Sequence, residues 1–457
     1  MARDLSLIQM IVSEMRYEGT PSLWHLLLWV MTRLGLPYES MSWVSAALAM
    51  AGAAYLLFKA PFPRPMRYAI AASYWIFYQY AVIARQYVLV PLLTFVAVDL
   101  FARAREKTYR FTMVLVLLAL TSVHGAVMGV AFAFAYAVHV SRDWKLLDGQ
   151  TLRRQIHAAM MFSGTLLLIA VQLFPPKDLF DPPAETGIAQ VFEGINGALL
   201  DWMPASLLVA ALFGTWAWRR GSIVLYVLGV ASMTCLYGLI HGWPHHLGLT
   251  FVVIVAVLWQ SWPTKEEIVR FTRPERMHFR ATVITVWVVL GVQIFYSGVA
   301  LYNEYRTPYS GAKEAATYLR GIIASNKRVY GFDYGMNAVL AYFDRNILAN
   351  QVSLNGGVSF YHHSSNQPIA DEQSFMRFRQ TRPEYLLVIC WYPPQAPQNR
   401  QLASRNGYVL ERAFPGRLIS KSSFGVYQTY LLFRRGDLPG IQAAGPRESG
   451  ANEPCKW

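Results

Sequence analysis

Residues 281–302 read ATVITVWVVLGVQIFYSGVALY and contain no charged side chain. A helix needs about 20 apolar residues to cross the hydrocarbon core of a bilayer, so this stretch predicts a membrane-spanning helix. Similar apolar runs precede it, and together they predict about ten spans in a polytopic α-helical membrane protein. The earlier candidates are residues 42–58, 68–84, 87–102, 111–123, 125–140, 156–174, 201–218, 222–240 and 246–262.

The composition divides the chain into a membrane part and a water-soluble part. Charged residues make up 15% of the chain and hydrophobic residues 54%, whereas soluble domains average about 25% charged residues. Nearly all long apolar runs fall within residues 22–302. We therefore predict an outer-loop remnant and a juxtamembrane helix over residues 1–41, a transmembrane helical domain over 42–305, a small α/β domain over 306–435, and a disordered tail over 436–457.

Lys and Arg residues occur in short clusters between the apolar runs, although the net charge is +14. This distribution is typical of cytoplasmic loops of membrane proteins and not of a nucleic-acid-binding patch. With the predicted spans, all the clusters fall on one face, in residues 59–67, 103–110, 142–154, 219–220 and 265–280. We expect that face to lie in the cytoplasm and residues 303–457 to lie outside it, in a bacterial inner (plasma) membrane.

Residues 22–35 are too short for a comfortable span. Trp and His at helical spacing favour a helix that lies at the membrane interface, which would place the N-terminus outside. The alternative is a span in a locally thinned bilayer with a cytoplasmic N-terminus. Thr20 and Pro21 suit the cap and the first turn of this helix.

The C-terminal part alternates helical and strand-like patterns, which predicts a small α/β fold. The expected helices are residues 311–325 and 371–380, and the expected strands are 328–332, 385–391, 408–413 and 427–434. The three cysteines, Cys235, Cys390 and Cys455, have neither metal-site nor disulfide spacing. The sequence therefore names no metal and no cofactor.

Candidate functional residues gather at the predicted outer ends of the spans. Arg85 is the only Arg or Lys in residues 68–101. Its guanidinium group either snorkels beside Tyr78, Tyr80 and Tyr87 or binds phosphate, for which its planar fork is well shaped.

Four further residues belong to the same group of candidates. Arg16 and Glu18 precede the juxtamembrane helix, and His124 and His246 lie at span junctions, where each either lines a site or is merely hydrated. Adjacent histidines at positions 245 and 246 make a metal site from that pair improbable. No acidic residue lies in the middle of a predicted span, which disfavours an ion-coupled transporter and favours an enzyme at the outer membrane surface.

The segments Tyr17–Leu28, YEGTPSLWHLLL, and Tyr80–Leu89, YAVIARQYVL, resemble two motifs of the GT-C superfamily of membrane glycosyltransferases. Protein O-mannosyltransferases and the aminoarabinose transferase of lipid A belong to it, and the resemblance covers most of residues 1–305. It implies transfer of a sugar from a polyprenyl-phosphate donor to a lipid, glycan or protein acceptor. It also implies that Arg85 contacts the donor phosphate and that Glu18 shapes the catalytic loop.

The resemblance further implies that Tyr87 and His246 line the cavity. Two departures accompany it. Thr20 stands where the family has His, and the chain is expected to lack the first span and the acidic motif that follows it. Asp4 and Glu18 are the nearest substitute catalytic acids, with Arg16 and His124 as further substrate-binding candidates. A catalytically inactive membrane scaffold or assembly factor is the main alternative, and a transporter is a third.

Overall fold

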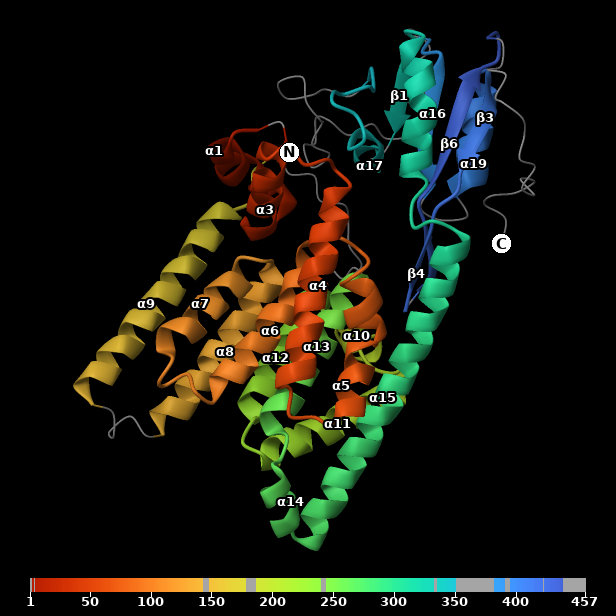
Figure 1. Ribbon diagram of the computed structural model, residues 1–457. Coiled ribbons are helices and arrows are strands. Elements are labelled where there is room, and N and C mark those ends of the chain that lie inside the picture. Colours follow the sequence, from red (N-terminus) through yellow and green to blue (C-terminus); the bar gives the residue numbers. More distant parts are fainter. Residues whose placement is uncertain are drawn as a thin grey trace.

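A computed structural model of the chain describes residues 2–3, 5–142, 148–177, 186–239, 244–332, 335–350, 382–390, 395–421 and 423–438. The chain forms a helical bundle with a small β-sheet domain beyond one of its ends (Figure 1). The long helix α15 (Arg273–Arg306) runs along the bundle and continues toward the sheet. Asp4, the helix expected over 371–380 and all of the predicted tail beyond residue 438 lie outside the described residues.

The bundle contains short helical segments, several of them near the N-terminus, together with longer helices. The short segments are α1 (Leu7–Gln9), α2 (Met15–Glu18), π-helices over Met10–Glu14 and Tyr74–Gln79, and 3₁₀ turns over Gln86–Val88 and Pro244–His246. The other helices are α3 (Leu23–Arg33), α4 (Ser40–Lys59), α5 (Arg64–Ala71), α6 (Leu89–Phe101), α7 (Thr108–Ala119), α8 (Val123–Ser141), α9 (Gly149–Gln172), α10 (Ile188–Asn196), α11 (Met203–Arg219), α12 (Ile223–Leu239), α13 (Leu247–Ser261) and α14 (Lys265–Arg270).

Among the described residues, five helical stretches are long and apolar enough to cross a membrane: α4, α8, α9, residues 244–261 and α15. Helices α7 and α12 and residues 86–101 are apolar but shorter. Exposed side chains such as Phe58 (82%), Trp43 (78%) and Leu168 (72%) give the bundle an apolar exterior. Such an exterior fits a membrane protein, because large apolar patches are uncommon on soluble monomers.

The span expected over residues 68–84 is not one continuous helix. Helix α5 ends at Ala71, Ser73 is extended, and a π-helix starts at Tyr74. The Ser297 hydroxyl of α15 donates to the Ala72 carbonyl at 2.8 Å. This bond gives the Ala72 carbonyl a hydrogen-bond partner at the helix break. The interior of a bilayer has no water that could serve as that partner.

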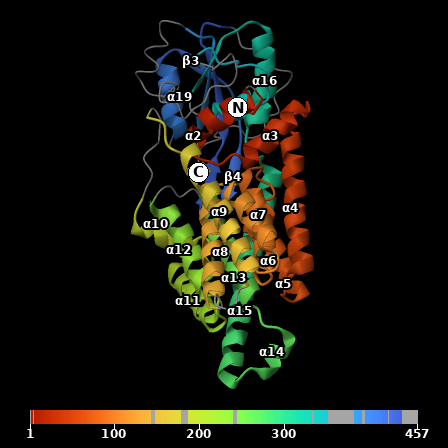
Figure 2. The same ribbon diagram turned by 90° about the vertical axis from the view of Figure 1, so that its left-hand side faces the viewer.

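The links between helices differ in character at the two ends of the bundle. The described residues of the five basic clusters, which exclude 143–147, lie at the end away from the sheet, where α14 projects outward, as the charge pattern predicted (Figure 2). We call this the basic end. The opposite end, with residues 73–88, 120–124, 196–203 and 244–248, faces the sheet, and we call it the domain end.

The predicted C-terminal α/β domain is present. Its sheet has the order β1-β2-β6-β3, with β1 (Val329–Phe332) parallel to β2 (Tyr385–Cys390) and β6 (Thr429–Arg435) antiparallel to both of its neighbours. Strand β3 (Tyr408–Phe414) lies at one edge. One face packs against α16 (Ala312–Ala324) and α17 (Met336–Leu340), and the other against α19 (Gln395–Arg405).

A second, two-stranded sheet formed by β4 (Arg417–Ser420) and β5 (Ser423–Tyr427) was not predicted. This hairpin extends from the α/β domain toward the bundle alongside α15 (Figure 1). It therefore brings the residue at its turn, Lys421, to the domain end of the helices.

Helix α13 lies at the centre of the bundle. Every residue of α13 except Gln260 is buried, as expected for a helix that is apolar on all sides. Gly248 occupies its first turn, where an added Cβ would lie 2.5 Å from the Trp75 ring and 2.6 Å from the Tyr80 hydroxyl. The start of α13 therefore fits against these two rings only because residue 248 has no side chain.

We predict that G248A destabilises the protein by about 1–3 kcal/mol, because the extra methyl group overpacks this contact. Gly291 of α15 provides a matched control, since its Cβ would meet open space. G291A should be neutral or stabilising by roughly 0.5–1 kcal/mol, as for glycine to alanine in a helix. Thermal unfolding in detergent measures both, and equal melting temperatures for the two variants would contradict the close contact.

Candidate functional site

Three of the predicted site residues come together at the domain end. Tyr87 precedes α6, His124 lies in the first turn of α8, and His246 immediately precedes α13. The Tyr87 hydroxyl lies 2.8 Å from Nε2 of His246, and the rings of His124 and His246 are 4.2 Å apart between centroids. We call Tyr87, His124 and His246 the His–Tyr cluster.

The local sequence explains how α8 presents His124. The Ser122 side chain caps α8 by accepting a bond from the Gly125 amide at 3.0 Å. A Cβ on Gly125 would collide with the Leu118 carbonyl and the Thr121 hydroxyl. Glycine therefore permits the tight α7–α8 turn that the sequence predicted, and this turn brings His124 to the end of the bundle.

A hydrogen bond also fixes the turn before α13. The Tyr80 hydroxyl donates to the His245 carbonyl at 2.8 Å. The His245 and His246 rings are 4.3 Å apart, and the His245 ring lies 5.2 Å from the ring of Tyr87. Both histidines therefore lie beside Tyr87.

The N-terminal segment joins the same end of the bundle. The Leu23 amide at the start of α3 donates to the Leu120 carbonyl in the α7–α8 turn at 3.1 Å, which places the start of α3 beside the turn that leads to His124. Burial lowers the pKa of His25, and the negative charge of Glu18 opposes that shift. Glu18 therefore lies close enough to His25 to act on it electrostatically.

Helix α3 has 11 residues and lies at the domain end. At about 1.5 Å per residue it is too short to cross a bilayer core of about 30 Å. The predicted cap is wrong in detail, because α3 starts at Leu23 with Ser22 as its cap residue, so Thr20 and Pro21 precede the helix.

Two of the predicted site residues carry positive charge and differ in surroundings. Arg85 is exposed on extended backbone just before Tyr87, and its charge acts on the Tyr87 hydroxyl. Arg16 donates from Nε to the Phe174 carbonyl at 3.0 Å. Arg16 thereby ties the N-terminal segment to the end of α9, whereas Arg85 stands beside the His–Tyr cluster.

Several buried polar atoms at the domain end have no hydrogen-bond partner within the described part of the chain. These include Thr20 Oγ1, His25 Nδ1, Trp75 Nε1 and His124 Nε2. A buried polar atom without a partner costs about 1–3 kcal/mol, so each such group needs an explanation. A bound ligand with its own donors and acceptors would supply these atoms with partners.

Sequence reasoning missed one charged residue at this end. The Lys421 side chain at the hairpin turn is fully buried, with 0% exposure, and its Nζ lies 3.2 Å from a carboxylate oxygen of Asp201. Nζ also donates to the carbonyls of Gly197 at 2.7 Å and Leu199 at 3.0 Å. No local pattern marks Lys421, because its partners lie more than 200 positions away in the chain.

Two aromatic rings complete the surroundings of Lys421. Nζ lies 5.9 Å from the ring centroid of Trp75 and 5.6 Å from that of Tyr296, within reach of a cation–π interaction. We call Gly197, Leu199, Asp201, Trp75 and Tyr296 the lysine socket. Burial lowers the pKa of Lys421 to about 8, against the opposing effect of Asp201, and burial raises the pKa of Asp201.

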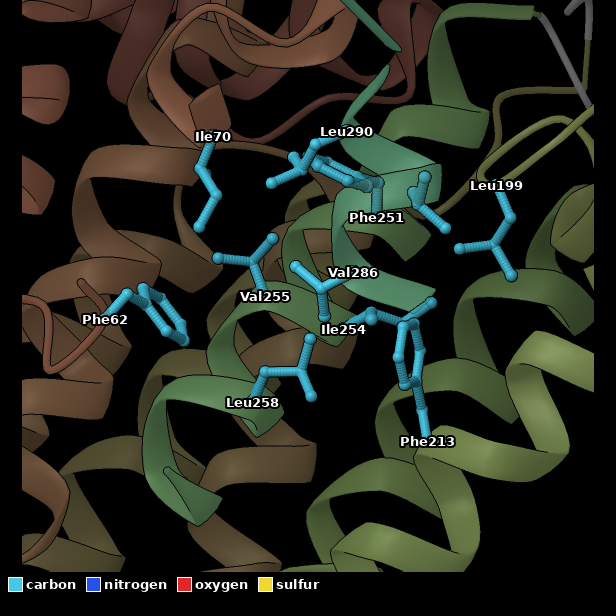
Figure 3. Close-up of a pocket in the computed structure, with 11 residues that line it drawn as sticks. Phe62, Ile70, Leu199, Phe213, Phe251, Ile254, Val255, Leu258, Val286 and Leu290 are labelled. Carbon is cyan, nitrogen blue, oxygen red and sulfur yellow. The ribbon is translucent and has the colours of Figure 1, made fainter. Parts of the chain in front are cut away.

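A small cavity lies deeper in the bundle and has a different character. It has a volume of about 20 Å³ and is lined by apolar side chains of α5, α11, α13 and α15 together with Phe62 and Leu199 (Figure 3). A cavity needs about 10–15 Å³ to hold one water molecule. This space is therefore too small and too apolar for a sugar or a phosphate, and the polar domain end is the better candidate site.

In the described ranges no group of three His, Cys, Asp or Glu side chains is arranged to hold a metal ion. Comparison of the chain with models of known protein families, with curated proteins and with solved structures finds no match in any of the three.

Lys421 predicts a pH dependence of stability. Its pKa is about 8 in the folded protein against 10.5 for an exposed lysine, so between these pH values the unfolded chain binds more protons than the folded one. The contribution of Lys421 to the free energy of unfolding should therefore rise as pH increases from about 8 and fall as pH drops through that value. Melting temperatures measured across this range should show the rise in the wild-type protein and lack it in K421M. Parallel pH profiles would contradict the lowered pKa.

Proposed function

We propose that the chain is a membrane glycosyltransferase that moves a sugar from a polyprenyl-phosphate donor to a lipid, glycan or protein acceptor at the domain end. One observation carries the proposal. The exposed Arg85 stands beside a cluster of imidazole and phenol groups from three segments that are far apart in the chain. Through the bond between Leu23 and Leu120, this cluster adjoins the segment that holds Glu18.

The residue types suit this chemistry. A guanidinium group can neutralise the charge that develops on a phosphate leaving group, which stabilises the transition state. The His–Tyr cluster offers hydrogen-bonding groups for the sugar or the acceptor hydroxyl, with Nε2 of His124 still available within the described residues. Glu18 or Asp4 would act as the general base, a role that contributes roughly 10²–10⁴-fold.

The proposal includes an arrangement in the membrane. The chain crosses the bilayer about ten times, with the basic end in the cytoplasm and the α/β domain outside, in the inner membrane of a bacterium. The apolar exterior of α4, α9 and α15 would then face lipid. The polyprenyl tail of the donor would remain in the bilayer while its phosphate reaches Arg85 from the membrane surface.

A catalytically inactive scaffold on the same fold is the second candidate. Its support is that Nε2 of His124 has no carboxylate partner among the described residues. A triad-like acid–histidine pair is therefore not formed at that nitrogen. The two candidates agree on the fold and differ only in whether transfer occurs.

Cysteine labelling tests the arrangement in the membrane. In a variant without native cysteines, K313C places a thiol on an exposed position of α16, and R270C places one at the basic end. We expect a membrane-impermeant maleimide to label K313C in intact spheroplasts and R270C only after permeabilisation, since basic loops stay in the cytoplasm. The reverse pattern would overturn the proposed orientation.

Replacement of Arg85 tests the chemistry. R85A should lower transfer from polyprenyl-phosphate sugars by about 10²–10³-fold, the cost of losing one transition-state donor. R85K, which keeps the charge but loses the planar fork, should retain part of the activity. R270A at the basic end is the matched control and should transfer at the wild-type rate.

The assay uses purified protein in lipid nanodiscs with a panel of labelled polyprenyl-phosphate hexoses and pentoses. Equal rates for R85A and the wild type would remove Arg85 from the site. Binding of polyprenyl phosphate by the wild type without any transfer to acceptor would favour the scaffold.

A further inference from the structure

The lysine socket and the His–Tyr cluster share one short turn, residues 245–248. On one side, an added Cβ at Gly197 would lie 2.5 Å from the Leu247 side chain, so residues 197–201, which we call the socket loop, pack directly against the residue after His246. On the other side, Trp75 packs against Gly248 at the same close range. The turn is therefore held between two parts of the socket.

The socket loop is held by contacts from α15 and from the β4–β5 hairpin. From α15, Nε2 of Gln293 donates to the carbonyls of Ala198 and Leu199, each at 3.1 Å. From the hairpin, Lys421 supplies the ammonium group that faces Gly197, Leu199 and Asp201. An ammonium group has three N–H donors: Lys421 donates to the carbonyls of Gly197 and Leu199, and its charge is paired with the Asp201 carboxylate at 3.2 Å.

Asp201 makes the loop sensitive to loss of the lysine. Its backbone is in the left-handed region with φ of 56°, a conformation that aspartate tolerates better than most residues. The other charges near Lys421 are those of Asp201 and, more distantly, Glu193. Without Lys421 the buried Asp201 carboxylate would lose its ion-pair partner, and such a loss is strongly destabilising.

We propose that Lys421 is a positioning residue for the His–Tyr cluster: the hairpin of the C-terminal domain holds the turn over residues 245–248 and thereby keeps His246 against Tyr87. The contact runs from Lys421 through Gly197 to Leu247, and in parallel through Trp75 to Gly248. The role of the cluster in sugar transfer rests on the function proposed above, whereas the mechanical link does not.

Chemical modification of histidine by diethyl pyrocarbonate, followed site by site with mass spectrometry, tests this link without any transfer assay. K421M keeps a side chain of similar length but removes the charge. We expect His246 to react about tenfold faster in K421M, because local opening of the turn sets its exposure. His157 is exposed in the first half of α9, and its rate should stay constant.

Two further variants complete the design. K313M removes an exposed lysine of α16 and should leave the His246 rate unchanged. The double variant K421M/D201N removes both buried charges, and it should return the rate toward the wild-type value because no unpaired charge remains.

The result that would overturn the proposal is an unchanged His246 rate in a folded K421M protein whose melting temperature is lowered. Lys421 would then stabilise only the docking of the hairpin and would not position His246. If K421M does not give a monodisperse preparation, D201N replaces it, since D201N keeps the ammonium group and both carbonyl acceptors. D201N should give a smaller increase at His246, and no increase would again overturn the proposal. A failed transfer assay would contradict the proposed enzyme and leave this measurement unaffected.

Discussion

The close contact between Gly248 and the rings of Trp75 and Tyr80 is the constraint on which the domain end depends. It lets α13, which is buried along nearly its whole length, begin directly beneath the π-helical segment after the α5 break. Because His245 and His246 immediately precede α13, the packing of an apolar helix decides where two imidazole rings lie. The geometry of the candidate site is thus a consequence of core packing, since interiors packed this closely transmit small displacements.

The two ends of the bundle handle charge in opposite ways. At the basic end the Arg and Lys side chains are mostly exposed, and ion pairs there, such as Arg103–Asp99 and Arg220–Glu267, are partly exposed and contribute little to stability. At the domain end the ion pair between Lys421 and Asp201 is buried. Burying it is costly unless every donor and acceptor is satisfied. The carbonyls of Gly197 and Leu199 each accept a hydrogen bond from the lysine, which offsets part of that cost.

The features that the sequence predicted correctly are those set by local pattern. Apolar runs located the helices, the basic clusters located one end of the bundle, and strand alternation located the small sheet. The sequence placed Tyr87, His124 and His246 separately at span junctions, and the structure brings the three together. Their role in sugar transfer, the ten crossings and the identity of the catalytic acid stay predictions. The break after Ala71 depends on Ser297, and Lys421 depends on a loop more than 200 residues earlier. Neither distant partner has a signature near the residue that it affects.

A lysine at the hairpin turn has a consequence that an apolar residue would not have. An apolar tip could bury comparable area against Trp75 and Tyr296, and buried ion pairs are often no more stabilising than such packing. Apolar packing, however, is non-directional and tolerates sliding, whereas an ammonium group with three acceptors has one favourable position. The hairpin can therefore dock in only one register, and the loop over Gly197–Asp201 that receives it also contacts Leu247. The Lys421 side chain accordingly fixes both the position of the soluble domain and the position of His246.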